Sequence, residues 1–157
     1  MIDSIVASPE WLDLSQVLLD SFERFLHRPL VNREGTIAEQ AQRLFHAPAV
    51  VVAHGTQTDP ILCFANQAAL DLWEADLQEM LKMPSRKTAE PTERSERAEM
   101  LQRGLATGFL EDYQGIRITT SGKRFQIDNA IIWNLMDGAG KRKGQAATFT
   151  NWRFITN

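Results

Sequence analysis

The sequence predicts an α+β fold, in which a five-stranded antiparallel sheet has short helices on one face and flanking helices at its N-terminus. Apolar residues recur with helical spacing early in the chain and with strand-like alternation in its last third. The element order is two helices, two strands, a cluster of short helices and three long strands, which differs from the repeated βαβ units of parallel sheets. Because the short helices fall between the two groups of strands, we expect them to close a cavity against the sheet.

The first expected element is a helix that begins at Ser8 and Pro9, because serine caps helices and proline suits the first helical position. Its apolar face, residues 11–26, is broader than an exposed helix should carry. This face either packs across the sheet or pairs with its copy, and we expect a homodimer through this helix. We therefore divide the chain into a flanking helix, residues 1–30, and a domain, residues 31–157.

A second helix and a hairpin follow. Thr36 and Glu39 have the spacing of a capping box, in which each residue satisfies a backbone N–H near the other. The apolar runs 49–55 and 61–65 are separated by the turn-forming segment TQTDP, which predicts an antiparallel pair of strands.

Short helices come next, and then the long strands. Asn66 and Asp76 can each cap a short helix, and Thr92 can cap a longer one that ends near Gly108. Ser121 and Gly122 suit a tight turn between the first two of three long strands. In the middle strand, apolar residues at alternate positions share one face, with Asn129 among them: Phe125, Ile127, Ile131, Trp133 and Leu135.

Composition excludes several classes of protein. The chain is 43% apolar and 24% charged, as is usual for a globular domain, and its 157 residues suit one domain. A net charge of −3 provides no broad cationic field, so we expect neither nucleic acid nor an anionic membrane as a partner. The single Cys63 excludes an internal disulfide, and no apolar run could span a bilayer. We expect a cytoplasmic protein.

Four segments carry a more specific resemblance. They are FHAPAVVVAHGTQTDPI (45–61), FANQAALDLW (64–73), PSRKTAEP (84–91) and GQAATF (144–149). Together they resemble the MEKHLA family, whose domains are PAS-like, over roughly residues 15–150. The resemblance implies a sensory or regulatory module and supplies no ligand.

MEKHLA domains occur as standalone bacterial proteins and at the C-terminus of plant class III homeodomain-leucine zipper proteins. This chain resembles the standalone kind, since no DNA-binding segment precedes the domain.

In a PAS-like fold, residues 84–91 lie in the helical wall of the pocket. Arg86 and Lys87 could then bind an anionic head group, since a guanidinium suits a carboxylate or a phosphate. Alternatively, Arg86 and Glu90 form structural pairs with loop backbone or with strand residues such as Asp112 or Asp128.

His54 ends the first strand and could donate to a ligand or switch its charge near neutral pH, although such a histidine often only bonds a turn. Several other side chains could line the pocket or simply fill the core. These further candidates are Phe64, Trp73, Tyr113, Arg117, Asn129, Trp133 and Gln145.

Cofactor chemistry has weak support in the sequence. Cys63 lies in a strand and lacks the Asn-Cys-Arg-Phe context of photosensory flavin domains, and the expected helix 92–107 has no histidine that could bind haem. The histidines lack the spacing of a metal site, and no catalytic motif is present. The cofactor is unknown, and a flavin adduct and histidine-ligated haem are disfavoured.

We therefore expect a sensory or regulatory module that binds a small molecule between sheet and helices, and not an enzyme. One alternative is a protein-interaction or dimerisation module with a solid core. The other is a small enzyme that uses His54 with a carboxylate such as Asp128 for acid-base chemistry.

Overall fold

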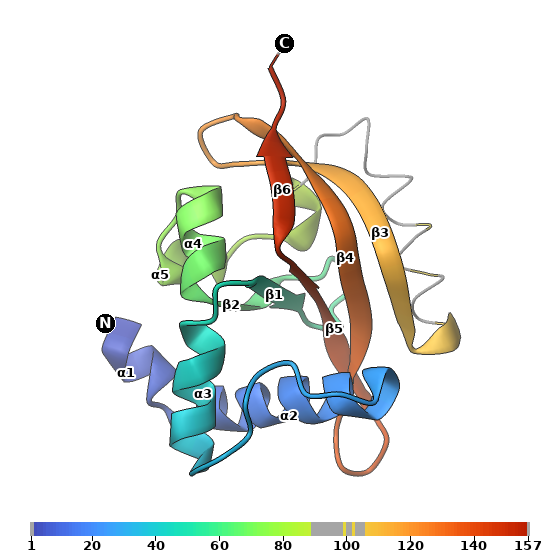
Figure 1. Ribbon diagram of the computed structural model, residues 1–157. Helices are drawn as coiled ribbons and strands as arrows, with labels where there is room; N and C mark the ends of the chain where they lie inside the picture. Colours follow the sequence, from blue (N-terminus) through green and yellow to red (C-terminus); the bar gives the residue numbers. More distant parts are fainter. Residues whose placement is uncertain (1, 89–98, 100–101, 103–105, 157) are drawn as a thin grey trace.

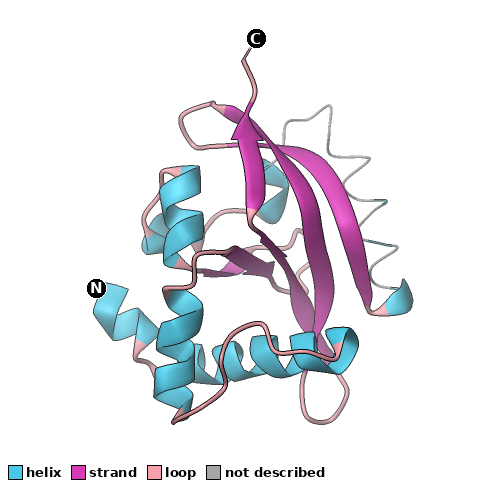
Figure 2. Cartoon of the chain, viewed as in Figure 1, coloured by secondary structure: helices cyan, strands magenta, loops and turns pink. Residues whose placement is uncertain are grey.

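The computed structural model describes residues 2–88, 99, 102 and 106–156, and it confirms the α+β fold with an antiparallel sheet. Figures 1 and 2 show the strands and the helices around them. The sheet order is β2-β1-β5-β4-β3, with β6 also paired to β4. The strands are β1 (Val50–His54), β2 (Leu62–Ala65), β3 (Phe109–Ile118), β4 (Arg124–Met136), β5 (Arg142–Phe149) and β6 (Asn151–Phe154). The helices are α1 (Ile2–Val6), α2 (Pro9–Leu26), α3 (Ile37–Phe45), α4 (Gln67–Trp73), α5 (Leu77–Met80) and the 3-10 helix η1 (Ser85–Thr88).

The predicted helix starts are confirmed by side-chain caps. Ser8 caps α2, Thr36 and Glu39 form the capping box of α3, and Asn66 and Asp76 cap α4 and α5. The helix predicted to begin at Thr92 lies largely outside the described residues.

Asn66 joins three elements besides capping α4. Its Nδ2 donates to the carbonyls of Leu44 and Ala49, at 3.2 and 2.8 Å, and its Oδ1 accepts from the backbone N–H groups of Val51 and Ala69. The side chain is fully buried. One amide therefore satisfies backbone groups at the end of α3, in β1 and in α4, where no water could replace it.

The last predicted strand is divided at Thr150 into β5 and β6. Both pieces pair with β4 in one register, as Ile131 opposite Thr148 and Asp128 opposite Asn151 show. The long strand is therefore continuous in its pairing and bent at one residue.

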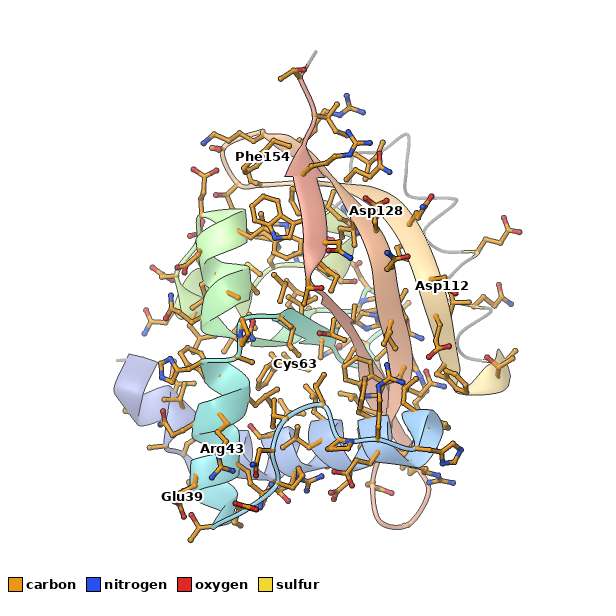
Figure 3. The ribbon with its side chains drawn as sticks, viewed as in Figure 1. Glu39, Arg43, Cys63, Asp112, Asp128 and Phe154 are labelled. Carbon is orange, nitrogen blue, oxygen red and sulfur yellow. The ribbon has the colours of Figure 1, made fainter. Side chains whose placement is uncertain are left out.

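At the level of this bend, irregularities also interrupt β3 and β4. The register of the β3–β4 pair shifts on both sides of Tyr113, and Asp112 and Asn129 have φ angles of 56° and 55°. Figure 3 labels Asp112 on β3 and the neighbouring Asp128 on β4. Aspartate and asparagine tolerate the left-handed conformation better than most residues. A bulge moves every later side chain of its strand to the other face of the sheet.

One face of the sheet is covered by α2. Directly opposed residues form a row across all five strands: Phe109, Trp133, Ala146, Ala53 and Phe64. Three aromatic residues of α2 cover this row. Phe25 stacks on Phe109, Phe22 meets Trp133 edge-on, and Trp11 stacks on Phe64 with the ring centroids 4.5 Å apart. Because two alanines occupy the middle of the row, the helix can approach the sheet closely.

This packing answers the question raised by the broad apolar face of residues 11–26. Leu18, Leu19 and Phe22 are buried within the chain, and the indole of Trp133 donates to the carbonyl of Leu18 at 3.3 Å. The alternative in which the face packs across the sheet is therefore correct. The expected homodimer through this helix loses the exposed apolar surface on which it was argued.

The predicted boundary near residue 30 falls between α2 and α3, and the hydrophobic core extends across it. None of the helices in the described part of the chain combines the length and apolar character needed to cross a membrane.

Candidate functional site

A cavity of about 60 Å³ lies on the face of the sheet opposite α2. Strands β1, β2, β3, β4 and β5 form its floor, and α4 and η1 contribute to its wall. The lining residues are Val52, Ala53, His54, Leu62, Trp73, Thr88, Tyr113, Arg117, Ile127, Ala130, Ile132, Gln145, Ala146, Ala147 and Phe149. Five of these were predicted as ligand-binding residues, namely His54, Trp73, Tyr113, Arg117 and Gln145.

On β3, Tyr113, Gly115 and Arg117 occupy alternate positions and so face the same side of the sheet. Tyr113 and Arg117 are buried, with 4% and 7% of their surface exposed. The guanidinium donates from Nη2 to the Tyr113 hydroxyl at 2.6 Å and from Nη1 to the Ile116 carbonyl at 2.8 Å. It also lies 5.3 Å from the centre of the Tyr113 ring. A buried cation is therefore held at the cavity by its own strand.

A second polar group crosses β1, β5 and β4. His54 is opposite Gln145, and Gln145 is opposite Asn134. The Gln145 amide donates from Nε2 to Asn134 Oδ1 at 3.2 Å. His54 Nδ1 lies 2.9 Å from the Gly55 carbonyl oxygen. Since a carbonyl only accepts hydrogen bonds, this contact places a proton on Nδ1.

The helical wall contributes Trp73 and Thr88. The indole N–H of Trp73 is buried and meets no hydrogen-bond acceptor among the described residues. Thr120, in the β3–β4 turn, donates from its hydroxyl and backbone N–H to the Trp73 carbonyl. The wall is thus fixed to the hairpin that carries Arg117.

Phe64 and Trp133 were predicted to line the pocket, and this placement is wrong. Both belong to the row beneath α2, on the other side of the sheet. The simple alternation predicted from Phe125 to Leu135 assumed a regular strand. The bulge at Asn129 reverses the alternation, so Ala130 and Ile132 line the cavity and Trp133 turns away.

Asn129, Arg86 and Lys87 are exposed and absent from the cavity lining, which corrects their predicted placement. In η1 the side chains three residues apart share a face, so Ser85 and Thr88 turn inward while the two cations turn outward. Arg86 pairs instead with Asp59, at 3.1 Å, in the loop between β1 and β2. This ion pair favours the structural alternative for Arg86, with Asp59 in place of Asp112 or Asp128. Glu90, the other residue of that alternative, lies outside the described residues.

The proposed acid-base pair is not assembled. Asp128 is outside the cavity and accepts a hydrogen bond from Gln126, and the described lining contains no carboxylate beside His54. Within the described ranges, no group of three histidine, cysteine or acidic side chains could hold a metal ion.

The sequence reasoning missed Gly115 and Thr88 as parts of the site. A glycine inside a strand indicates a bulge or a close approach of other atoms. A Cβ at residue 115 would lie 2.6 Å from the Tyr113 hydroxyl and 2.9 Å from Arg117 Nη1. The pattern Tyr113-x-Gly115-x-Arg117 could therefore have identified the cluster, because a Cβ at residue 115 would displace the Tyr113 hydroxyl and Arg117 Nη1 from these positions.

Solved structures share this fold. A PAS domain from Colwellia psychrerythraea superposes with a TM-score of 0.59 at 12% identity, over 75% of this chain and 95% of its own. A light-oxygen-voltage domain studied with a flavin analogue gives 0.59 at 20% identity, over 75% of this chain and 85% of its own. An RNA-binding light-oxygen-voltage receptor gives 0.64 at 16% identity, over 77% of this chain and 35% of its own.

The residues present do not fit a flavin–cysteine adduct. The chain has one cysteine, Cys63, which lies on β2 outside the cavity lining (Figure 3). Burial raises the pKa of its thiol to about 11, which disfavours the reactive thiolate.

Plant homeobox-leucine zipper proteins are among the relatives of this chain. REVOLUTA of Arabidopsis thaliana is 23% identical over 154 residues, and ATHB-8 of the same plant is 26% identical over 155 residues. These matches cover 94% and 95% of this chain and 18% of each relative, so the chain spans about a fifth of their length. The MEKHLA domain model matches residues 12–154. With the sheet, the helical wall and most of α2 inside that match, the chain belongs to the MEKHLA domain family.

Proposed function

We propose that this chain is a PAS-like sensory module that binds a small molecule in the cavity between the sheet and the wall formed by α4 and η1. The observation that carries the proposal is the composition of the cavity. Apolar side chains line most of it, and a few fixed polar groups converge on it, as is typical of small-molecule sites. Its volume of about 60 Å³ favours a ligand much smaller than those of pockets of about 300–1,000 Å³.

Native mass spectrometry of the purified chain tests the proposal, since a bound molecule would add its mass to that of the protein. Ala147→Leu, on the floor of the cavity, should fill the space and remove the added mass. Ala139→Leu is the matched control, because Ala139 is exposed in the loop between β4 and β5. If Ala147→Leu keeps the same bound mass as the control, the ligand lies elsewhere and the proposal fails.

A protein-interaction module is the second candidate, and the exposed aromatic residues of β6 favour it. Trp152 and Phe154 expose 39% and 47% of their surface beside a hollow lined by Pro48, Ala68 and Leu72 (Figure 3 labels Phe154). Aromatic residues are enriched at protein interfaces. This surface could also join two copies of the chain, in place of the helix that the sequence suggested.

Sedimentation velocity of the double variant Trp152→Ser/Phe154→Ser tests self-association at this surface. Loss of a wild-type dimer would support the second candidate. A variant that sediments like the wild type would remove β6 as a self-association surface.

A further inference from the structure

We infer that the ligand of this cavity is a carboxylate on a short apolar body, and that Arg117 and Tyr113 bind its carboxylate group. The inference rests on the proposed function and specifies the chemistry of the ligand. It is carried by a buried positive charge for which the described chain supplies no negative partner.

Arg117 is 7% exposed at the cavity, yet it belongs to none of the ion pairs among the described residues. The acidic residues in those pairs are on the surface and contact other cations. Charged side chains are rarely buried without a counter-charge, because removing a charge from water is costly. An anion that enters the cavity would supply this missing partner.

The geometry also leaves donors available for such an anion. Two N–H groups of the guanidinium have acceptors, the Ile116 carbonyl and the Tyr113 hydroxyl. The remaining N–H groups meet no acceptor among the described residues. The Tyr113 oxygen accepts from Arg117, so its own proton is free to be donated. Adjacent guanidinium and phenol donors match the two oxygens of one carboxylate.

Gly115 shows that the sheet accommodates this pair. With a Cβ there, the Tyr113 hydroxyl and Arg117 Nη1 could not keep their positions, because both lie within 3.0 Å of where that atom would be. The absence of a side chain at residue 115 therefore allows the guanidinium to lie along the strand beneath the cavity.

The rest of the lining defines the body of the ligand. Val52, Ile127, Ile132 and Phe149 provide apolar surface, and the cavity volume is about 60 Å³. One cation in a small apolar site fits a monoanion with few carbon atoms better than a phosphate, whose greater charge needs more donors.

Isothermal titration of the full chain with straight-chain carboxylates from acetate to hexanoate tests the inference. Primary alcohols and alkylphosphonates of the same chain lengths are the comparison ligands. We expect the best carboxylate to bind about tenfold or more tightly than its alcohol, which corresponds to about 1.4 kcal/mol. Arg117→Met keeps an unbranched apolar stem but removes the guanidinium, and it should abolish this preference while alcohols still bind.

Arg86→Met is the matched control, because Arg86 is exposed and paired with Asp59, and it should bind like the wild type. If Arg117→Met does not fold, Tyr113→Phe serves in its place. That variant removes only the hydroxyl and should weaken carboxylates more than alcohols.

Other outcomes separate the two proposals. Alcohols that bind as tightly as carboxylates would overturn the carboxylate inference and leave the cavity proposal standing. Phosphonates that bind more tightly than carboxylates would overturn it in the same way. If no compound binds and native mass spectrometry shows no added mass, the proposed function fails as well.

Discussion

The Asn66 side chain shows how a single polar residue can organise several elements. Its amide donates to two carbonyls and accepts from two backbone N–H groups, all in the interior. Asn66→Asp keeps the acceptors but loses the donors and places a carboxylate against the carbonyls of Leu44 and Ala49. We expect the free energy of unfolding to fall by about 2–4 kcal/mol in urea denaturation.

Asn32→Asp is the matched control for this change. Asn32 is exposed, and its Oδ1 accepts from the backbone N–H of Glu34, an interaction that aspartate preserves. Equal stability of the two variants would show that the donors of Asn66 contribute little.

The Cys63 thiol provides a second prediction at this scale. Burial raises its pKa to about 11, so little thiolate exists near pH 8. We expect iodoacetamide to alkylate the folded protein about 100-fold more slowly than free cysteine, with the rate rising toward pH 11. Alkylation at the rate of the free amino acid would contradict this burial.

The same shift predicts how stability depends on pH. The pKa of the Cys63 thiol is higher in the folded chain than in the unfolded chain. Its titration therefore leaves the free energy of unfolding unchanged below the unfolded pKa and lowers that free energy as the pH rises from there toward 11. The comparison of wild type with Cys63→Ala between pH 8 and 11 isolates this effect from other titrating groups. The free energies of unfolding of the two proteins should run parallel up to about pH 8.5 and diverge above it.

Strand β4 is the element in which the predicted placement of side chains was partly wrong. Phe125 and Ile127 were correctly predicted to share a face, because period-two alternation holds in a regular strand. Trp133 was misplaced because Asn129 opens a bulge, and an asparagine in an apolar run does not distinguish a bulge from a polar residue that faces a ligand.

The caps at Thr36 and Asn66 were correct because they depend on neighbouring residues only. Tyr113 and Arg117 were among the predicted site residues, and period-two spacing places them on one face of β3. That this face borders the cavity depends on the packing of α4 and η1 against the sheet, which the sequence does not specify.

A substitution at Asn129 tests this account of the bulge. Asn129→Val places a β-branched residue at a φ of 55° and should lower the free energy of unfolding by about 1–2 kcal/mol. Asn129→Gly, which adopts this φ without strain, should be as stable as the wild type or slightly more so. Because residue 129 is exposed, packing should contribute little to the difference. If valine is tolerated as well as glycine, the bulge is not strained at this position.

Helix α2 gives the second prediction at the scale of elements. Leu18 is fully buried between the helix and the sheet, so Leu18→Ala should lower the free energy of unfolding by about 2–5 kcal/mol. Asp13→Ala, on the exposed side of the same helix, should have little effect. Neither variant should change the sedimentation coefficient of the folded protein. A change of oligomeric state in Leu18→Ala alone would instead support dimerisation through the apolar face.

In the whole molecule, the two faces of the sheet differ in what covers them. The face beneath α2 is filled by aromatic rings and two alanines, whereas the opposite face encloses the cavity and its polar groups. Helix α2 and the cavity therefore lie on opposite faces of the same single-layered sheet. Ala53 and Ala146 belong both to the row beneath the helix and to the lining of the cavity. A change in the shape of the cavity would be transmitted to α2 through these small residues, as the proposed sensory function requires.

The cavity also bears on how the molecule responds to hydrostatic pressure. An internal void makes the folded chain occupy more volume than its atoms require, and unfolding eliminates that volume. Compression therefore favours the unfolded form, and it does so less when a ligand or a larger side chain occupies the space. The volume change of unfolding would then report whether the cavity is occupied, whatever molecule or side chain fills it.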